Sequence, residues 1–394
     1  MSQESTISTQ PFIPRRLDSI LHADLFDRGY TETALQLMIG GEKIEGNEKA
    51  RETKDPNVLQ LADGRFRMYV SWGRSDQQRW EMGMFEANTL DSKEWDFIGT
   101  VSIDLPGDRV CAPAVLRHPL KNGKDLFIMD VQSECFASDT ECVVYRGYSS
   151  DGVHFTRSKR PLVDKALLKK WGYEVSGVYD AGTSIVELDG KRYEVVLFSG
   201  YRTGDRMGFG DVYMIKRAVH TKKGKWEPPV LVINQDEIEF HNRPFEDGSE
   251  WGNEGAKVVQ LQPNLFLWIF VSFLKDEHMK QRVTWATSRS LLEKPIVLGI
   301  PYPANSDQEH GHSDMIVLGD ALVEIRQQRN GKDGEWRLVY AQHSLQKVSE
   351  YCSSVLSRST TLPLPQPRRI DQQNRMQGVQ KKHAIGQEQQ RRLA

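Results

Sequence analysis

The sequence has 394 residues, a formal net charge of −2 and a hydrophobic share of 38%. The balanced charge argues against a nucleic-acid-binding protein, because such proteins usually carry a strong basic excess. The length allows one large domain or two ordinary ones, and the apolar share is sufficient for a packed core.

Two segments and the cysteines indicate the cellular location of the protein. Residues 1–16 lack the apolar stretch of a signal peptide. The longest apolar-rich run, residues 265–274, is too short to span a bilayer. Four cysteines do not make a disulfide framework, so Cys135 and Cys142 are expected to be free thiols rather than a bridge across a hairpin. A cytoplasmic protein with no membrane partner is expected.

The first predicted element is a partly helical extension over residues 1–44. Apolar residues recur with loose helical spacing from Leu17 to Leu37, which predicts one or two short helices. From about Asp55 onward, runs rich in Val, Ile, Tyr, Phe and Trp alternate with Asp-Gly, Asn-Gly and Gly-Lys turns. This pattern is typical of β-hairpins, so the rest of the domain is predicted to be all-β.

The hairpins recur at a long period. Each follows a short phrase, and the phrases begin at Asp55, Ala112, Asp180, Glu254 and His312, at intervals of 57, 68, 74 and 58 residues. Several hairpins are followed by third and fourth strand signals, and a four-stranded unit repeated five times is what a β-propeller needs. We therefore predict a five-bladed β-propeller over residues 45–350, with an irregular β-sandwich as the alternative.

The last segment, residues 351–394, has a different composition. It contains the stretch LPLPQP and, from Arg368 onward, seven Lys/Arg residues against one Asp and one Glu. Such a composition buries too little apolar surface to fold alone. We expect a flexible tail, with a Pro-motif ligand for a partner domain as the alternative.

The repeated phrases carry acidic residues that are far apart in the sequence. In a propeller the first strand of each blade lines a central channel, so Asp55, Asp180, Glu254 and His312 are expected around one mouth, with Asp314 as a further polar group. Hydrolysis of a glycosidic bond needs one carboxylic acid that protonates the leaving oxygen and a second carboxylate that activates water or attacks directly. The pattern therefore indicates a glycosidase.

The order of the phrases resembles that of the family 43 glycoside hydrolases and their invertase-like relatives, which are five-bladed propellers. The matching dipeptides are Asp55-Pro56, Ala112-Pro113, Glu254-Gly255 and Gly311-His312, with Asp180 in the third blade. The third phrase departs from the family's Asp-Pro-Ser, since Asp180 is followed by Ala181 and Gly182. The resemblance covers roughly residues 45–345.

The resemblance implies a role for each of these residues. Asp55 would be the general base of an inverting enzyme, Glu254 the general acid, and Asp180 a residue that orients the sugar or Glu254. His312 would hold water or a cation near the axis. No cofactor is expected to be required; a structural Ca²⁺ near His312 rests on the resemblance alone, and a zinc site at His310 and His312 is a weaker reading.

The neighbours of these residues are candidate substrate contacts. The aromatic side chains of Trp72, Tyr179 and Trp251 are candidates to stack on a sugar ring, and Arg109 and Arg326 are candidate donors to its hydroxyls. The expected partner is a small carbohydrate whose identity and linkage the sequence does not give. A retaining, invertase-like hydrolase or transferase and a non-catalytic sugar-binding or scaffold propeller are the alternatives, because a fold alone proves no activity.

Overall fold

The computed structural model describes most of the chain between residues 31 and 364. The residues in this range that it leaves undescribed are 40–41, 44–51, 75–78, 108, 121, 136–137, 203–209, 220–223, 235–250, 275–280, 300, 303–307, 331–335 and 360–362. The described residues are mostly β-strand and form four hydrogen-bonded sheets. Among the described helices, none has the length and the apolar character needed to cross a membrane.

The strands fall into five antiparallel groups that follow one another along the chain. The groups are β4 (Glu52–Gln60), β5 (Phe66–Arg74), β6 (Arg79–Ala87) and β7 (Glu94–Thr100); β9 (Arg109–Pro119), β10 (Asp125–Cys135), β11 (Ser138–Ser149) and β12 (His154–Arg157); β13 (Gly177–Leu188), β14 (Lys191–Tyr201), β15 (Gly210–Ala218) and β16 (Val230–Ile233); β17 (Trp251–Gln262), β18 (Leu265–Leu274), β19 (Gln281–Ser288) and β20 (Ile296–Gly299); and β21 (Gln308–Leu318), β22 (Ala321–Asn330) and β23 (Arg337–Ser344). The third and fourth groups are joined into one sheet where Gly210 pairs with Asn253.

The hairpins form where the sequence predicts them, because their turn residues adopt the required conformation. Between β13 and β14, Asp189 and Gly190 have φ angles of 52° and 70°. Positive φ at both central residues is what a tight two-residue hairpin needs, and an Asp-Gly pair tolerates it best.

The N-terminal segment differs from its prediction. The described part of residues 17–37 is extended: β1 (Thr31–Ala34) pairs antiparallel with β23, and β2 (Gln36–Ile39) pairs parallel with β7 and antiparallel with β3 (Glu42–Lys43). Another short strand, β8 (Ser102–Ile103), pairs with β12. The side chain of Leu35 is buried in the core that the first and fifth groups share. Pairing with two sheet edges thus overrides the helical spacing, and this part of the extension belongs to the sheets.

In the described part of the chain, two helices flank the sheets. Helix α2 (Lys165–Lys170) begins after Asp164, whose carboxylate accepts a hydrogen bond from the Leu167 N–H at 2.7 Å. Helix α3 (Leu345–Arg358) buries an apolar face that includes Val348 and Cys352 against the fourth and fifth groups. The packed structure therefore extends past the predicted boundary at residue 350.

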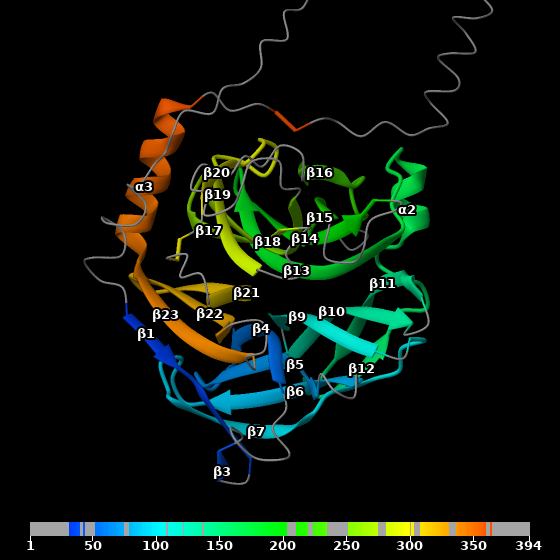
Figure 1. Cartoon of the computed structure of the whole chain (residues 1–394), viewed down its shortest axis with the longest axis vertical. Helices are drawn as coiled ribbons and strands as arrows, with labels where there is room; N and C mark the ends of the chain where they lie inside the picture. The colour runs from blue at the N-terminus through cyan, green and yellow to red at the C-terminus, as the bar shows by residue number, and fades with distance from the viewer. Residues whose placement is uncertain are drawn as a thin grey trace, which may run out of the picture.

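The first strands of the five groups lie in a ring. Strand β4 contacts β9, β9 contacts β13, β13 contacts β17, β17 contacts β21, and β21 contacts β4. Figure 1 shows the groups following one another around the centre in chain order, with α3 beside the fourth and fifth. Residues from the first strands, distant in sequence, therefore share one axis.

Each of these five strands carries a β-bulge at the same place. Two residues of the first strand face one residue of the second strand at 55–56, 112–113, 180–181, 255–256 and 311–312. The first bulge residue has a positive φ in four cases: Asp55, Ala112, Asp180 and Gly255, at 52°, 50°, 48° and 59°. Because a bulge bends a strand and changes the direction of its side chains, the repeat places a bend at the same point of all five strands around the axis.

Candidate functional site

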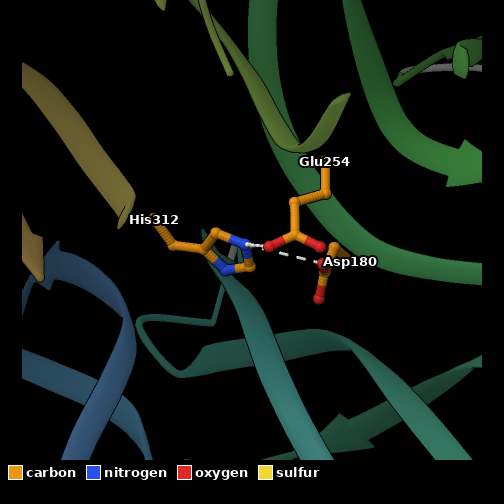
Figure 2. Close-up of side chains that lie close together, drawn as sticks. All are labelled: Asp180, Glu254 and His312. Carbon is orange, nitrogen blue, oxygen red and sulfur yellow. Dashed lines mark hydrogen bonds and ion pairs between the residues drawn. The ribbon is translucent and has the colours of Figure 1, made fainter. Parts of the chain in front are cut away.

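The four residues predicted to share a mouth meet at the imidazole of His312. Its Nδ1 lies 2.5 Å from Asp55 Oδ1, and its Nε2 lies 2.9 Å from Glu254 Oε1 and 3.5 Å from Asp180 Oδ2. Figure 2 shows Glu254 and Asp180 on the same side of the ring. Four different first strands, β4, β13, β17 and β21, thus bring three carboxyl groups around one imidazole.

The bulges explain how these side chains meet. Asp55 and Asp180 occupy the first bulge position, whereas Glu254 lies one residue before the bulge and His312 is the second bulge residue. Gly255 is required next to Glu254, because a Cβ there would lie 2.6 Å from His312 Cδ2. The missing side chain lets the imidazole approach β17 closely enough to reach Glu254.

The charges of this set shift the pKa values of its members in opposite directions. Burial would raise the pKa of Asp55, but the charge and hydrogen bond of His312, helped by Lys54 and Ser71, lower it from 3.8 to about 2. Burial would lower the pKa of His312, but Asp180, Asp55 and Glu254 raise it well above 6.5. At neutral pH the ring is therefore an imidazolium that donates from both nitrogens.

A small axial cavity adjoins the set. It measures about 40 Å³ and is lined by residues of all five first strands, among them Asp55, Asp180 and His312. This is room for ordered water and too little for a sugar ring. A substrate would have to bind outside this cavity, with its reacting atoms facing the acids.

Asp314 lines the same axial cavity, and its carboxylate is held there by structural contacts. Its carboxylate accepts hydrogen bonds from Asn57 Nδ2 at 3.0 Å and from the Val58 N–H at 2.6 Å, and it pairs with Lys257 Nζ. Asn57 Oδ1 in turn accepts from the Val115 N–H at 2.8 Å. These contacts join β4, β9, β17 and β21 in a polar layer, beyond which lies a wider cavity of about 770 Å³.

Two of the predicted aromatic contacts, Trp72 and Tyr179, lie in the core. Trp72 is 3% exposed and stacks on Phe97 with ring centroids 4.9 Å apart. Tyr179 is 1% exposed, and its hydroxyl donates to the Asn253 carbonyl at 3.4 Å. Both rings are core residues, since the apolar packing between strands covers the faces that a sugar would need.

Of the two predicted arginine donors, Arg109 and Arg326, the structure describes the side chain of Arg326. Arg326 is fully buried: its Nε donates to His310 Nδ1 at 3.1 Å and its guanidinium lies 3.7 Å from the ring centroid of Tyr302. It is therefore a packing residue of the fifth group and not a donor to a sugar. The side chains of Arg109 and Trp251 lie outside the described part of the structure.

The described residues include one group that could hold a cation. Asp180, Glu254 and His312 each offer a ligand atom, and these atoms lie within 4.8 Å of one another. Ca²⁺ prefers six to eight oxygen ligands, whereas this set offers two carboxylates and a ring that already donates to acids. The donors therefore fit Ca²⁺ poorly, and His310, the second residue of the zinc reading, bonds Arg326 instead.

The cysteines of the described part agree with the expectation of free thiols. Cys111, Cys142 and Cys352 form no disulfide, and Cys142 and Cys352 are buried. The side chain of Cys135 lies outside the described residues, so its state is not tested.

Several residues that hold the site were missed in the sequence. Gln327 Oε1 accepts from the Asp55 N–H at 2.9 Å, Gln132 Oε1 from the Asp180 N–H at 2.9 Å, and Ser71 Oγ from the Ala112 N–H at 2.9 Å. Each lies on the second strand of the preceding group in the ring. An alignment of the five second strands would have been the only sequence signal, because single Gln and Ser residues in strands are common.

Comparison with solved structures shows what this arrangement is similar to. A thermostable family-43 glycoside hydrolase superposes with a TM-score of 0.50 at 17% identity, over 74% of this chain and 89% of that one. An endo-arabinase from Bacteroides thetaiotaomicron gives a TM-score of 0.52 at 16% identity, over 73% and 93%. No family model and no curated protein matches the sequence. The predicted resemblance is confirmed for the fold.

Proposed function

We propose that this protein, which has the fold of the family-43 glycoside hydrolases, is itself a glycoside hydrolase. The five strand groups would be the blades of a five-bladed propeller, and β1 would complete the fifth blade beside β23. One observation carries the proposal: Asp55, Asp180 and Glu254 come from three blades and converge on His312 at the axis.

The chemistry of each residue follows from its surroundings. Asp55, with a pKa of about 2, is ionised near neutrality and can accept a proton from water in the axial cavity. Glu254 would donate a proton to the leaving oxygen as the glycosidic bond breaks, and water would complete the new bond at the anomeric carbon. Asp180, on the same side of the ring as Glu254, would orient it. No cofactor is required for these steps.

The position of His312 favours inversion over retention. Asp55 bonds one ring nitrogen and Glu254 bonds the other, so a whole imidazole lies between the two carboxyl groups. Inverting enzymes hold their carboxyl groups about 6.5–9.5 Å apart, and retaining enzymes only about 5–5.5 Å apart. In inverting enzymes the wider spacing leaves room for the attacking water.

The test is a panel of oligosaccharides and aryl glycosides assayed with the wild type, Asp55→Asn and Glu254→Gln. Both variants are expected to lose about 10²- to 10⁴-fold in kcat on oligosaccharides, because each removes a proton-transfer group. Glu254→Gln should keep most of its activity on aryl glycosides with good leaving groups, which need no protonation. Asp104→Asn, at an exposed position away from the axis, is the matched control.

The outcomes separate the candidate functions. Inverted product observed by NMR would support Asp55 as a base, and retained configuration would make it a nucleophile in an invertase-like mechanism. Wild-type turnover in both variants would refute the site. Sugar binding without turnover in all proteins would indicate the non-catalytic alternative.

A further inference from the structure

The register of the five bulges exposes one departure in an otherwise regular pattern. The second-strand residues that face the bulges are Val70, Val131, Phe198, Phe270 and Gln327. Four of these equivalent positions carry an apolar side chain in the core between blades. The fifth carries an amide that is 1% exposed. Burying an amide costs free energy unless it is hydrogen-bonded, so its partners indicate its purpose.

Both ends of the Gln327 amide have partners in other blades. Its Oε1 accepts from the Asp55 N–H at 2.9 Å, and its Nε2 donates to Gln281 Oε1 at 3.1 Å. A Cβ at Gly311 would overlap both amides, so the glycine of the fifth phrase makes room for this pair. The amide pair thus connects the fourth, fifth and first blades at the acid set.

The bond to Asp55 matters because of the backbone there. Asp55 has a φ of 52°, which is unfavourable for a residue with a Cβ, and as a bulge residue it lies outside the ladder between β4 and β5. A buried N–H in that position needs an acceptor. Gln327 supplies it, and it thereby fixes the backbone from which the Asp55 carboxylate reaches His312.

We propose that Gln327 is a positioning residue for Asp55, with Gln281 holding its amide in place. The kinetic consequence rests on the proposed function; the structural consequence does not. Without the acceptor, the Asp55 carboxylate loses its fixed position beside His312 Nδ1 and beside the axial cavity. A displaced base lowers the rate of the chemical step while substrate contacts elsewhere are unchanged.

The test compares Gln327→Met with Gln327→Glu. Methionine keeps the length of the side chain and removes the acceptor, so kcat is expected to fall about 10- to 100-fold with KM within twofold of the wild type. Glutamate keeps an oxygen at the Oε1 position, and the Gln281 amide can flip to donate to it, so part of kcat should return. Val131→Ala is the control. Val131 faces the bulge at Ala112, which carries none of the acids of the site, so this change should lower stability and leave kcat unchanged.

A second measurement does not depend on turnover. The ring resonances of His312 report the hydrogen bond from Nδ1 to Asp55, and we expect them to shift in Gln327→Met and to remain near the wild-type values in Gln327→Glu and Val131→Ala. If the wild type cleaves no substrate, the proposed function fails and these resonances still test the positioning role. Wild-type resonances in Gln327→Met, or an equal loss of kcat in Val131→Ala, would overturn it.

Discussion

At the scale of single residues, the contact between Asp55 and His312 links the stability of the fold to pH. The pKa of Asp55 falls from 3.8 to about 2 on folding, so its contribution to stability is complete above pH 4 and is lost as the pH falls toward 2. The pKa of His312 rises well above 6.5, so its contribution is complete below that value and is lost as the pH rises through the folded pKa. Both contributions to stability are therefore complete between about pH 4 and pH 6.5.

We therefore predict that the wild type loses free energy of unfolding on both sides of this window. The acid side should account for about 2 kcal/mol, because a pKa shift of one unit corresponds to about 1.4 kcal/mol. Thermal unfolding followed from pH 2 to pH 9 measures it, with Asp55→Asn as the comparison. The variant should show a smaller decline toward acid than the wild type; parallel curves would mean that other carboxylates dominate.

At the scale of secondary structure elements, the bulges show what could be read from the sequence and what could not. The five phrases were visible because Asp-Pro, Ala-Pro, Glu-Gly and Gly-His precede apolar strands in order. Their register was not visible, and the structure shows that Glu254 and His312 lie on either side of the position that Asp55 and Asp180 share. The residues that accept hydrogen bonds from the bulge N–H groups were not visible in the sequence either. Gln327 lies 272 residues from Asp55, and only the ring of strands brings the two together.

The burial of Trp72 and Tyr179 has a related cause. Proximity in sequence to a phrase places Trp72 and Tyr179 on strands near the site, but the side chains of a strand alternate between its two faces. Both rings point into the cores between neighbouring strand groups, where large apolar surface is most stabilising. Only the pairing register, which the sequence does not give, decides which face a residue occupies.

A prediction at this scale concerns the contact between β13 and β17. A Cβ at Gly182 would overlap the carbonyl oxygen of Ala256, which belongs to the neighbouring backbone and cannot rotate away. Gly182→Ala should therefore lower the free energy of unfolding by about 2–4 kcal/mol, which urea denaturation measures. Gly190→Ala is the control, since its Cβ meets nothing within 4 Å and only its φ of 70° is unfavourable, at about 1–2 kcal/mol. Equal losses would mean that the close approach is unimportant.

At the scale of the whole molecule, the two ends of the described chain stabilise the ring. After β23, helix α3 packs on the fourth and fifth groups, and Leu364 returns to the core of the third and fourth. At the other end, Thr31–Ala34 pair with the outer edge of β23, while Leu35 fills the core between the first and fifth groups. The described residues 31–39 and 351–358, which lie outside the predicted range 45–350, therefore pair with or pack on the sheets. Composition alone does not show which short segments find a sheet edge.

The pairing of β1 with the edge of β23 leads to a prediction for the full-length chain. Deleting residues 1–35 would remove the strand that covers the edge of β23 and the buried side chain of Leu35, which is 2% exposed. Burying a Leu side chain contributes about 1.5–3 kcal/mol, and the exposed edge would lose its ladder and become a site for association with other chains. We expect a lower Tm, and larger species in size-exclusion chromatography at high concentration. A deletion that ends before Thr31 keeps both features and serves as the control. If the two truncations behave alike, neither the ring nor its fifth strand group depends on β1.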